Sequence, residues 1–130
     1  MGREGGFFDR KLLFSNSQEV TASAASTYEI NTGVADANLG AGTPIGVFFI
    51  IDETFTGGTS MTFELQHSAD GSSYATIAQL PAIAEASLVA GEKIGPLALP
   101  DEHYQYLQIY YTVVGSHGAG AITSYLQPIM

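Results

Sequence analysis

The sequence contains no cysteine and no tryptophan, and only four of its 130 residues are lysine or arginine. Without cysteine, the chain has no disulfide, no thiolate nucleophile and no cysteine-ligated zinc site. The longest apolar run, at 45–51, is far shorter than the roughly 20 residues of a membrane-spanning helix. The segment 1–11 also lacks the apolar core of a signal peptide. We therefore expect a non-membrane protein that folds without a metal or a disulfide, as a chain of this length can.

Positive charge is also distributed unevenly along the chain. Residues 1–11 contain Arg3, Arg10 and Lys11, whereas residues 12–130 contain only Lys93 against eleven acidic side chains, a formal balance of −10. Because an acidic body repels phosphate and one lysine cannot neutralise a nucleic-acid backbone, we expect no nucleic-acid partner. The change in charge divides the chain into an N-terminal arm, 1–11, and a single domain, 12–130.

Short segments with alternating apolar residues recur between turn signals, and no long segment has a helical repeat. The clearest strand is 104–114, whereas the run 45–51 is apolar on both faces, which is typical of a central strand covered on both sides. About eight strands without a helix predict an all-β fold, an antiparallel β-sandwich or jelly roll. The expected core consists of Val47, Phe49, Phe63, Leu65, Leu107, Ile109 and Val113.

Turn-forming residues set the expected strand boundaries. We expect Ser15–Ser17 to end an apolar stretch and a new strand to follow at 18–24. Pro96 indicates an edge strand or a bulge, and 82–88 is left open between a helical turn and an extended connection. Glycine and polar residues predict three loops, at 33–44, 52–60 and 115–120.

His67, Ser68 and Asp70 are the residue types of a hydrolase triad, placed within four positions of one another. A β-hairpin from 61 to 80 explains them better, because Asp70-Gly71 is a strong turn dipeptide. Successive side chains of a strand point to opposite faces, so these three groups are not brought together by local sequence. We expect His67 to be half-buried at a strand end and capped by a turn hydroxyl, and we expect no catalytic residue and no enzymatic activity.

Neither a metal nor a cofactor is expected. His67, His103 and His117 are scattered, and no two of them stand at a zinc-ligand spacing. The cluster Asp101-Glu102-His103 is interpreted as a solvated turn rather than a cation site, and no glycine-rich phosphate loop precedes a helix.

Tyr104, Tyr106 and Tyr110 would share one strand face with Gln108. Tyrosine combines a large apolar body with a polar tip, which suits sheet packing or a subunit interface. The alternative is a carbohydrate-binding module that uses this face.

Several segments together resemble one protein family. The matching segments are "FFDRKLLFSNSQEVTASAASTYEINTG" at 7–33, then "LQHSADGSSYATI", "ASLVAGEKIGPLALP" and "YLQIYYTVVG". Within the first of them, the matches are Phe8-Asp9, Leu12-Leu13-Phe14-Ser15, Ser26-Thr27, Ile30 and Gly33. In the order and spacing of these segments, the chain resembles the capsid cement (decoration) proteins of tailed bacteriophages, of the Bordetella-phage type.

The resemblance implies a jelly-roll protein that binds in many copies to the outer surface of an icosahedral phage head. Its implied partners are the major capsid protein and further copies of itself, as a dimer or a trimer. It would be made in the host bacterial cytoplasm and would reside in the virion. A ligand that binds only the assembled shell stabilises that shell by mass action.

The N-terminal arm is the expected contact segment. The expected contact residues are Phe7, Phe8, Arg10, Lys11, Leu12 and Phe14. We expect Phe7 and Phe8 to insert against a neighbouring protomer or the capsid, because two phenylalanines at ~1.5–3 kcal/mol each outweigh exposed ion pairs at ~0–1 kcal/mol. Arg10 and Lys11 would pair with acidic groups there. The alternative is that both phenylalanines pack onto their own sandwich.

Overall fold

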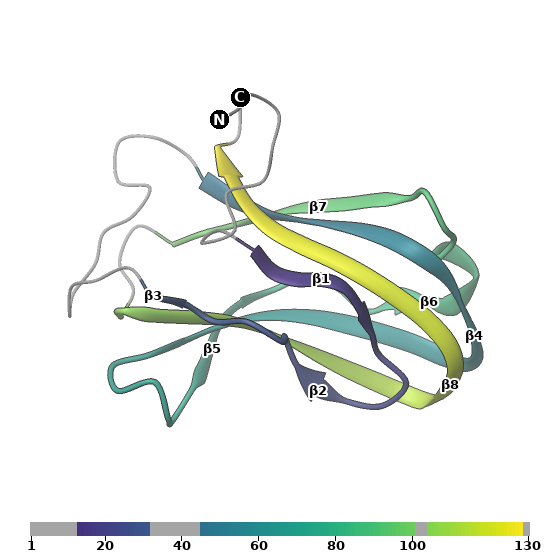
Figure 1. Ribbon diagram of the computed structural model, residues 1–130, viewed down its shortest axis with the longest axis horizontal. Coiled ribbons are helices and arrows are strands. Elements are labelled where there is room, and N and C mark those ends of the chain that lie inside the picture. Colours follow the sequence, from purple (N-terminus) through teal and green to yellow (C-terminus); the bar gives the residue numbers. More distant parts are fainter. Residues whose placement is uncertain (1–12, 32–44, 101–103, 129–130) are drawn as a thin grey trace.

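The chain folds almost entirely into antiparallel strands (Figure 1). The computed structural model describes residues 13–31, 45–100 and 104–128. The elements are β1 (Leu13–Glu19), β2 (Ala24–Ala25), β3 (Ile30–Asn31), β4 (Ile45–Ser68), β5 (Ala75–Gln79), β6 (Ile83–Ala84), the 3₁₀ turn η2 (Glu85–Ser87), β7 (Lys93–Ala98) and β8 (Tyr106–Pro128). The predicted fold class, all-β and antiparallel, is confirmed.

Two long strands, β4 and β8, organise the whole fold. They pair with each other along their full length, from Ile45 opposite Pro128 to Ser68 opposite Tyr106. Figure 1 shows them running side by side and bending together at one end. The pairing register shifts several times between Ile51 and Ser60, where this bend lies. Because both strands bend at the same place, the ribbon folds back over itself and makes a sandwich of two layers.

Each layer contains one half of the bent ribbon. In the first layer, residues 45–51 and 121–128 are flanked by β7 and β1. In the second layer, residues 60–68 and 106–114 are flanked by β5 and β6 on one side and by β2 and β3 on the other. Side chains alternate along each strand, so each layer has one inner face toward the other layer and one outer face.

The core lies between the two inner faces. The rings of Phe49 and Phe63 stack with centroids 4.4 Å apart, although both belong to β4, because the two halves of that strand lie in different layers. Of the predicted core residues, all but Val113 are fully buried, and Val113 is half-buried against the same cluster. Burial of each large apolar side chain contributes about 1.5–3 kcal/mol, so this cluster holds the layers together.

A polar network also links the layers through the middle of the core. The Tyr111 hydroxyl is 2.7 Å from the Ser15 and Ser124 hydroxyls, and all three side chains are buried. Ser15 reaches this position because β1 continues through 15–17, with register shifts against β8 and a positive φ of 50° at Ser17. The predicted end of the strand at Ser15–Ser17 is therefore wrong, because the irregularity there is a bulge inside a strand. The predicted strand at 18–24 ends early, since residues 21–23 form an exposed bend.

Two of the three predicted loops are also wrong. Residues 52–60 belong to β4 and residues 115–120 belong to β8, and the two segments face each other at the bend. Glycine and polar residues suit a loop and a sharply bent ribbon equally well, because both need backbone freedom. The third predicted loop, 33–44, lies outside the described residues, as does the boundary between arm and domain at residues 11 and 12.

The remaining boundaries follow the expected chemistry. The open segment 82–88 contains the short strand β6 and the turn η2. The predicted edge position of Pro96 is confirmed, since β7 pairs with β4 alone among the described strands. Among the described residues, no helix is long and apolar enough to cross a membrane.

Candidate functional site

The turn of the predicted β4–β5 hairpin is held by Ser68 and Asp70. The Ser68 hydroxyl donates to Asp70 Oδ1 over 2.8 Å and accepts the Gly71 N–H over 2.9 Å. Asp70 Oδ1 also accepts the N–H groups of Ser73 and Ser72, at 3.0 and 2.8 Å. These two backbone hydrogen bonds, followed by that from Ser68, lower the pKa of Asp70 to about 2. The serine and the aspartate therefore cap a turn, as the hairpin interpretation requires.

His67 is engaged elsewhere. Its ring stacks on the Tyr104 ring with centroids 4.4 Å apart, and its Nδ1 accepts the Tyr104 backbone N–H over 3.1 Å. His67 is half-buried at the end of β4, as predicted. The expected cap by a turn hydroxyl is wrong, because the Ser68 hydroxyl serves the turn instead. The geometry brings His67 into contact with neither member of the suspected triad.

The outer face of the second layer is polar, and we call it the polar face. Its members are Glu64, Gln66, Thr76, Tyr106, Gln108, Tyr110 and Thr112. They bond to one another across the strands: Gln108 Nε2 donates to Gln66 Oε1 over 2.6 Å, and the hydroxyls of Thr76 and Thr112 both donate to Glu64. This face satisfies most of its hydrogen-bonding groups internally and needs no ligand to do so.

The predicted row of three tyrosines does not form. Tyr106 and Tyr110 lie on the polar face, on either side of Gln108 along β8. Tyr104 precedes the strand and stacks on His67. His67 points to the same side of β4 as the buried Leu65, which is the side opposite the polar face. Sequence spacing predicted one face because it assumed that β8 begins at residue 104, whereas the strand begins at Tyr106.

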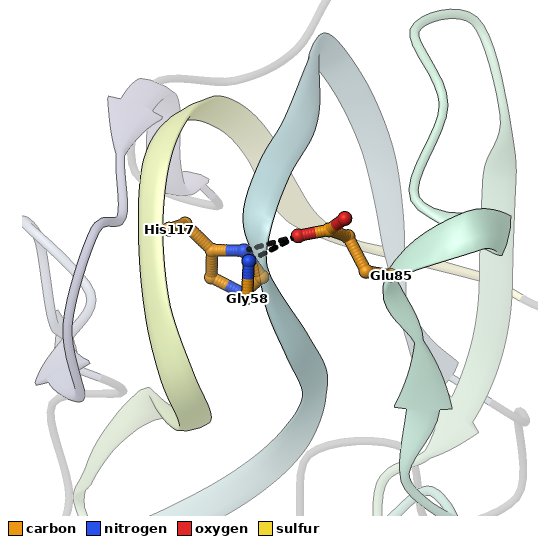
Figure 2. A network of polar contacts seen from close by, with 3 residues as sticks. All are labelled: Gly58, Glu85 and His117. Carbon is orange, nitrogen blue, oxygen red and sulfur yellow. Dashed lines mark hydrogen bonds and ion pairs between the residues drawn. The ribbon is translucent and has the colours of Figure 1, made fainter.

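The bend of the ribbon buries a histidine. The side chain of His117 is fully buried, and its Nδ1 lies 3.3 Å from Glu85 Oε2 (Figure 2). Figure 2 also shows that Glu85 reaches from η2 to the backbone N–H of Gly58. The His117 ring meets Phe55 edge-on at 5.1 Å, and a Cβ at Gly58 would lie 2.5 Å from the His117 ring. Glu85 thus connects η2 to β4 through Gly58 and contacts β8 at His117.

The outer face of the first layer carries an apolar row of Leu13, Tyr125 and Phe48. Leu13 and Phe48 are the pairing partners of Tyr125 in β1 and β4, so the three side chains lie on adjacent strands. The Tyr125 and Phe48 rings are stacked at 5.8 Å. Lys93 of β7 places its Nζ 4.7 Å from the centroid of the Phe48 ring, which is a cation–π contact.

The predicted contact residues of the arm divide into two groups. Phe7, Phe8, Arg10, Lys11 and Leu12 lie outside the described residues. Phe14 is described, and its exposed fraction is 0 % within the protein's own core. Phe14 is therefore removed from the contact set, because it follows Leu13 in β1 and points inward where Leu13 points outward.

In the described part of the chain, no group of three histidine, aspartate or glutamate side chains is arranged to hold a metal ion. The suspected cluster at 101–103, which includes His103, lies outside the described residues. Two side chains converge at the bend: Glu85 accepts the Gly58 N–H and lies 3.3 Å from His117 Nδ1, whereas neither ring nitrogen of His117 has a hydrogen-bond partner among the described residues.

The comparison with known families adds an assignment. Residues 14–126 match the family described as Bbp16. The chain belongs to the Bbp16 family. This family carries the name of a Bordetella phage protein, so the Bbp16 domain is a phage protein domain, which confirms the coarser part of the resemblance. No curated protein matches the chain.

Sequence reasoning missed two features of this Bbp16 protein. The contact of Glu85 with His117 joins residues far apart in the chain and had no local signal. The apolar row did have one, since the run 45–51 is apolar on both faces. The pattern predicts a strand covered on both sides, and in this two-layer sandwich the core covers only one side of β4. The outward Phe48 and Ile50 therefore mark a face that differs from an ordinary solvated one.

Proposed function

We propose that this Bbp16 protein is a capsid decoration protein. It binds the outer surface of an icosahedral phage head and stabilises contacts between major capsid protein subunits. The observation that carries the proposal is the match to a phage protein family over residues 14–126. The two layers of the β-sandwich are linked by hydrogen bonds in the core, and one outer face is polar while the other carries the apolar row. This arrangement suits a protein that acts by binding.

The proposal includes its partners and its location. The protein binds the major capsid protein and further copies of itself, and it resides on the virion surface after synthesis in the host cytoplasm. Arg10 and Lys11 of the arm belong to the contact surface, and the apolar Phe7, Phe8 and Leu12 hold the arm in position for that contact. Many weak contacts made by an oligomer on a repeating lattice raise the effective affinity, so each contact can be modest.

We also propose that the protein performs no chemical step. In support, Ser68 and Asp70 are committed to a turn, and His67 is held by Tyr104. The carbohydrate-binding alternative loses its main support, because Tyr104 does not join Tyr106 and Tyr110 on one face.

The decisive measurement is the copy number of this protein in purified particles of the phage that encodes it. We expect a copy number comparable with that of the major capsid protein, released from intact heads before the capsid dissociates. A few copies per particle, located at the tail, would refute the decoration role and would favour an adhesin. Glycan-array binding by the purified protein would then identify the alternative function.

A further inference from the structure

Two of the three side chains of the apolar row are buried although the row lies on an outer face, and the third, Phe48, is half-buried. Leu13 is 8 % exposed and Tyr125 is 4 % exposed. Neither belongs to the cluster of buried side chains that fills the space between the layers. By contrast, Tyr106 and Tyr110 on the polar face are only half-buried. The low exposure of Leu13 and Tyr125 within the single chain means that other parts of the same chain cover them.

The position of the row indicates which segment covers it. Leu13 is the first described residue, so the arm leaves the domain directly at the row. The arm supplies Phe7, Phe8 and Leu12. The five residue-to-residue steps from Phe8 to Leu13 span about 16 Å when extended, whereas the row crosses two strand spacings, about 10 Å. The tether is therefore long enough for Phe8 to reach Phe48 of the same chain.

The same arrangement would concentrate the positive charge of the chain. Three of the four basic residues, Arg3, Arg10 and Lys11, lie in the arm. The fourth, Lys93, stands over Phe48 at the end of the row. An arm lying on the row would gather all the positive charge of an otherwise acidic protein on one side of the first layer.

We propose that the apolar row is the docking site of the protein's own N-terminal arm, with Phe7 and Phe8 as the anchoring side chains. The anchored arm presents Arg10 and Lys11 beside Lys93, as a cationic side that faces an acidic surface of the partner. This second statement rests on the proposed decoration function; the docking itself does not. A short tether gives an effective concentration in the millimolar range, so docking within one chain is preferred over exchange between copies at lower protein concentrations.

The absence of cysteine allows a direct test in the full chain. Phe8→Cys is combined with Ile50→Cys, which lies two residues from Phe48 on the same outer face. The control combines Phe8→Cys with Gln66→Cys, at an outward position of β4 on the polar face. Under mild oxidation at micromolar concentration, we expect an intramolecular disulfide in the first variant and none in the control. Equal cross-linking in both variants, or none in either, would overturn the proposal, and a cross-linked dimer would show that the arm docks on a second copy.

A thermal double-mutant cycle gives an independent readout. We expect the double substitution Phe7→Ser/Phe8→Ser to lower the melting temperature by about 5 °C. The same double substitution should have little further effect in a Phe48→Ser background, because the docking site is already lost. In a Tyr110→Ser background, on the polar face, its effect should remain complete. Additive effects in both backgrounds would refute docking on Phe48, and neither experiment requires capsids, so either can fail while the decoration function stands.

Discussion

The two outer faces of the sandwich are made from the same two strands and yet differ in chemistry. On the polar face, β4 and β8 contribute glutamine, glutamate and threonine side chains that bond to one another. On the other outer face, the same strands contribute Phe48 and Tyr125, which stack on each other. A face whose polar groups bond to one another has few groups left to bind a partner, whereas covering a face of stacked rings is favourable because it removes apolar surface from water. Under the proposed decoration function, we infer from this difference that the first layer is the binding side.

The bend places the two outer faces on opposite sides of the molecule. A substitution that disrupts the bend should therefore have the largest effect on stability. Gly120 has φ of 141°, and a Cβ there would lie 2.2 Å from the Phe55 ring. Gly120→Ala should therefore reduce the free energy of unfolding by about 3–5 kcal/mol, through backbone strain and overpacking together. Gly91→Ala is the matched control, because Gly91 also has a positive φ, of 95°, but no atom within 4 Å of the added Cβ. Urea denaturation measures both variants, and equal losses would mean that packing at the bend is unimportant.

The second prediction tests which of the two outer faces contributes to binding of the phage head. Phe48→Ser should weaken binding of the protein to phage heads at least tenfold, because it removes apolar surface worth about 1.5–3 kcal/mol from the site that holds the arm and its contact residues Arg10 and Lys11. Gln108→Ala, on the polar face, should leave the affinity within twofold. Co-sedimentation with heads that lack the protein measures both. Raising the salt concentration should weaken binding of the unmodified protein only modestly, since exposed ion pairs contribute about 0–1 kcal/mol each. The opposite ranking of the two variants would reverse the assignment of the faces.

A smaller effect is expected from loss of the Tyr111 hydroxyl, which links the two layers inside the core. Burial raises the pKa of the Tyr111 hydroxyl to about 12, from an ordinary value of 10.0, and the hydrogen bonds to Ser124 and Ser15 offset part of this rise. The folded-state pKa is raised, so the corresponding stability is present below pH 10 and is lost as the pH rises through 12. Tyr111→Phe should cost about 1–3 kcal/mol at pH 7, because it leaves two buried serine hydroxyls without this partner. It should also flatten the decline in stability between pH 10 and 12, as followed by urea denaturation at several pH values.

The smallest effect is expected at the hairpin beside the polar face. His67→Gln should leave binding to phage heads nearly unchanged, since His67 contacts Tyr104 and supports the local structure of its own chain. Its thermal stability should fall slightly through the loss of ring stacking, by about 0.5–1.5 kcal/mol. A large loss of head binding in a normally folded His67→Gln protein would place the binding surface at the second layer and would contradict the assignment of the faces.

Alternation along the strands was enough to predict the class of fold and most of the core. Phe63, Leu65, Leu107 and Ile109 are buried because the period of two puts them on the inner face. The hairpin at Asp70-Gly71 was equally predictable, since turn geometry is determined by the residues that make it. These features depend on neighbours in the chain, and neighbours are visible in the sequence.

The bend and the two outer faces depend on residues that are distant in the sequence. The segments 52–60 and 115–120 have the composition of loops, and only their pairing with each other makes them one bent ribbon. The bend places one half of β4 and β8 in each layer, and this placement decides which side chains of each half point outward. The sequence by itself determined the strands with alternating apolar residues outside the bend, and the apolar side of those strands. The tertiary structure decided which of those sides face each other, because burial is a property of the partner surface as well as of the residue.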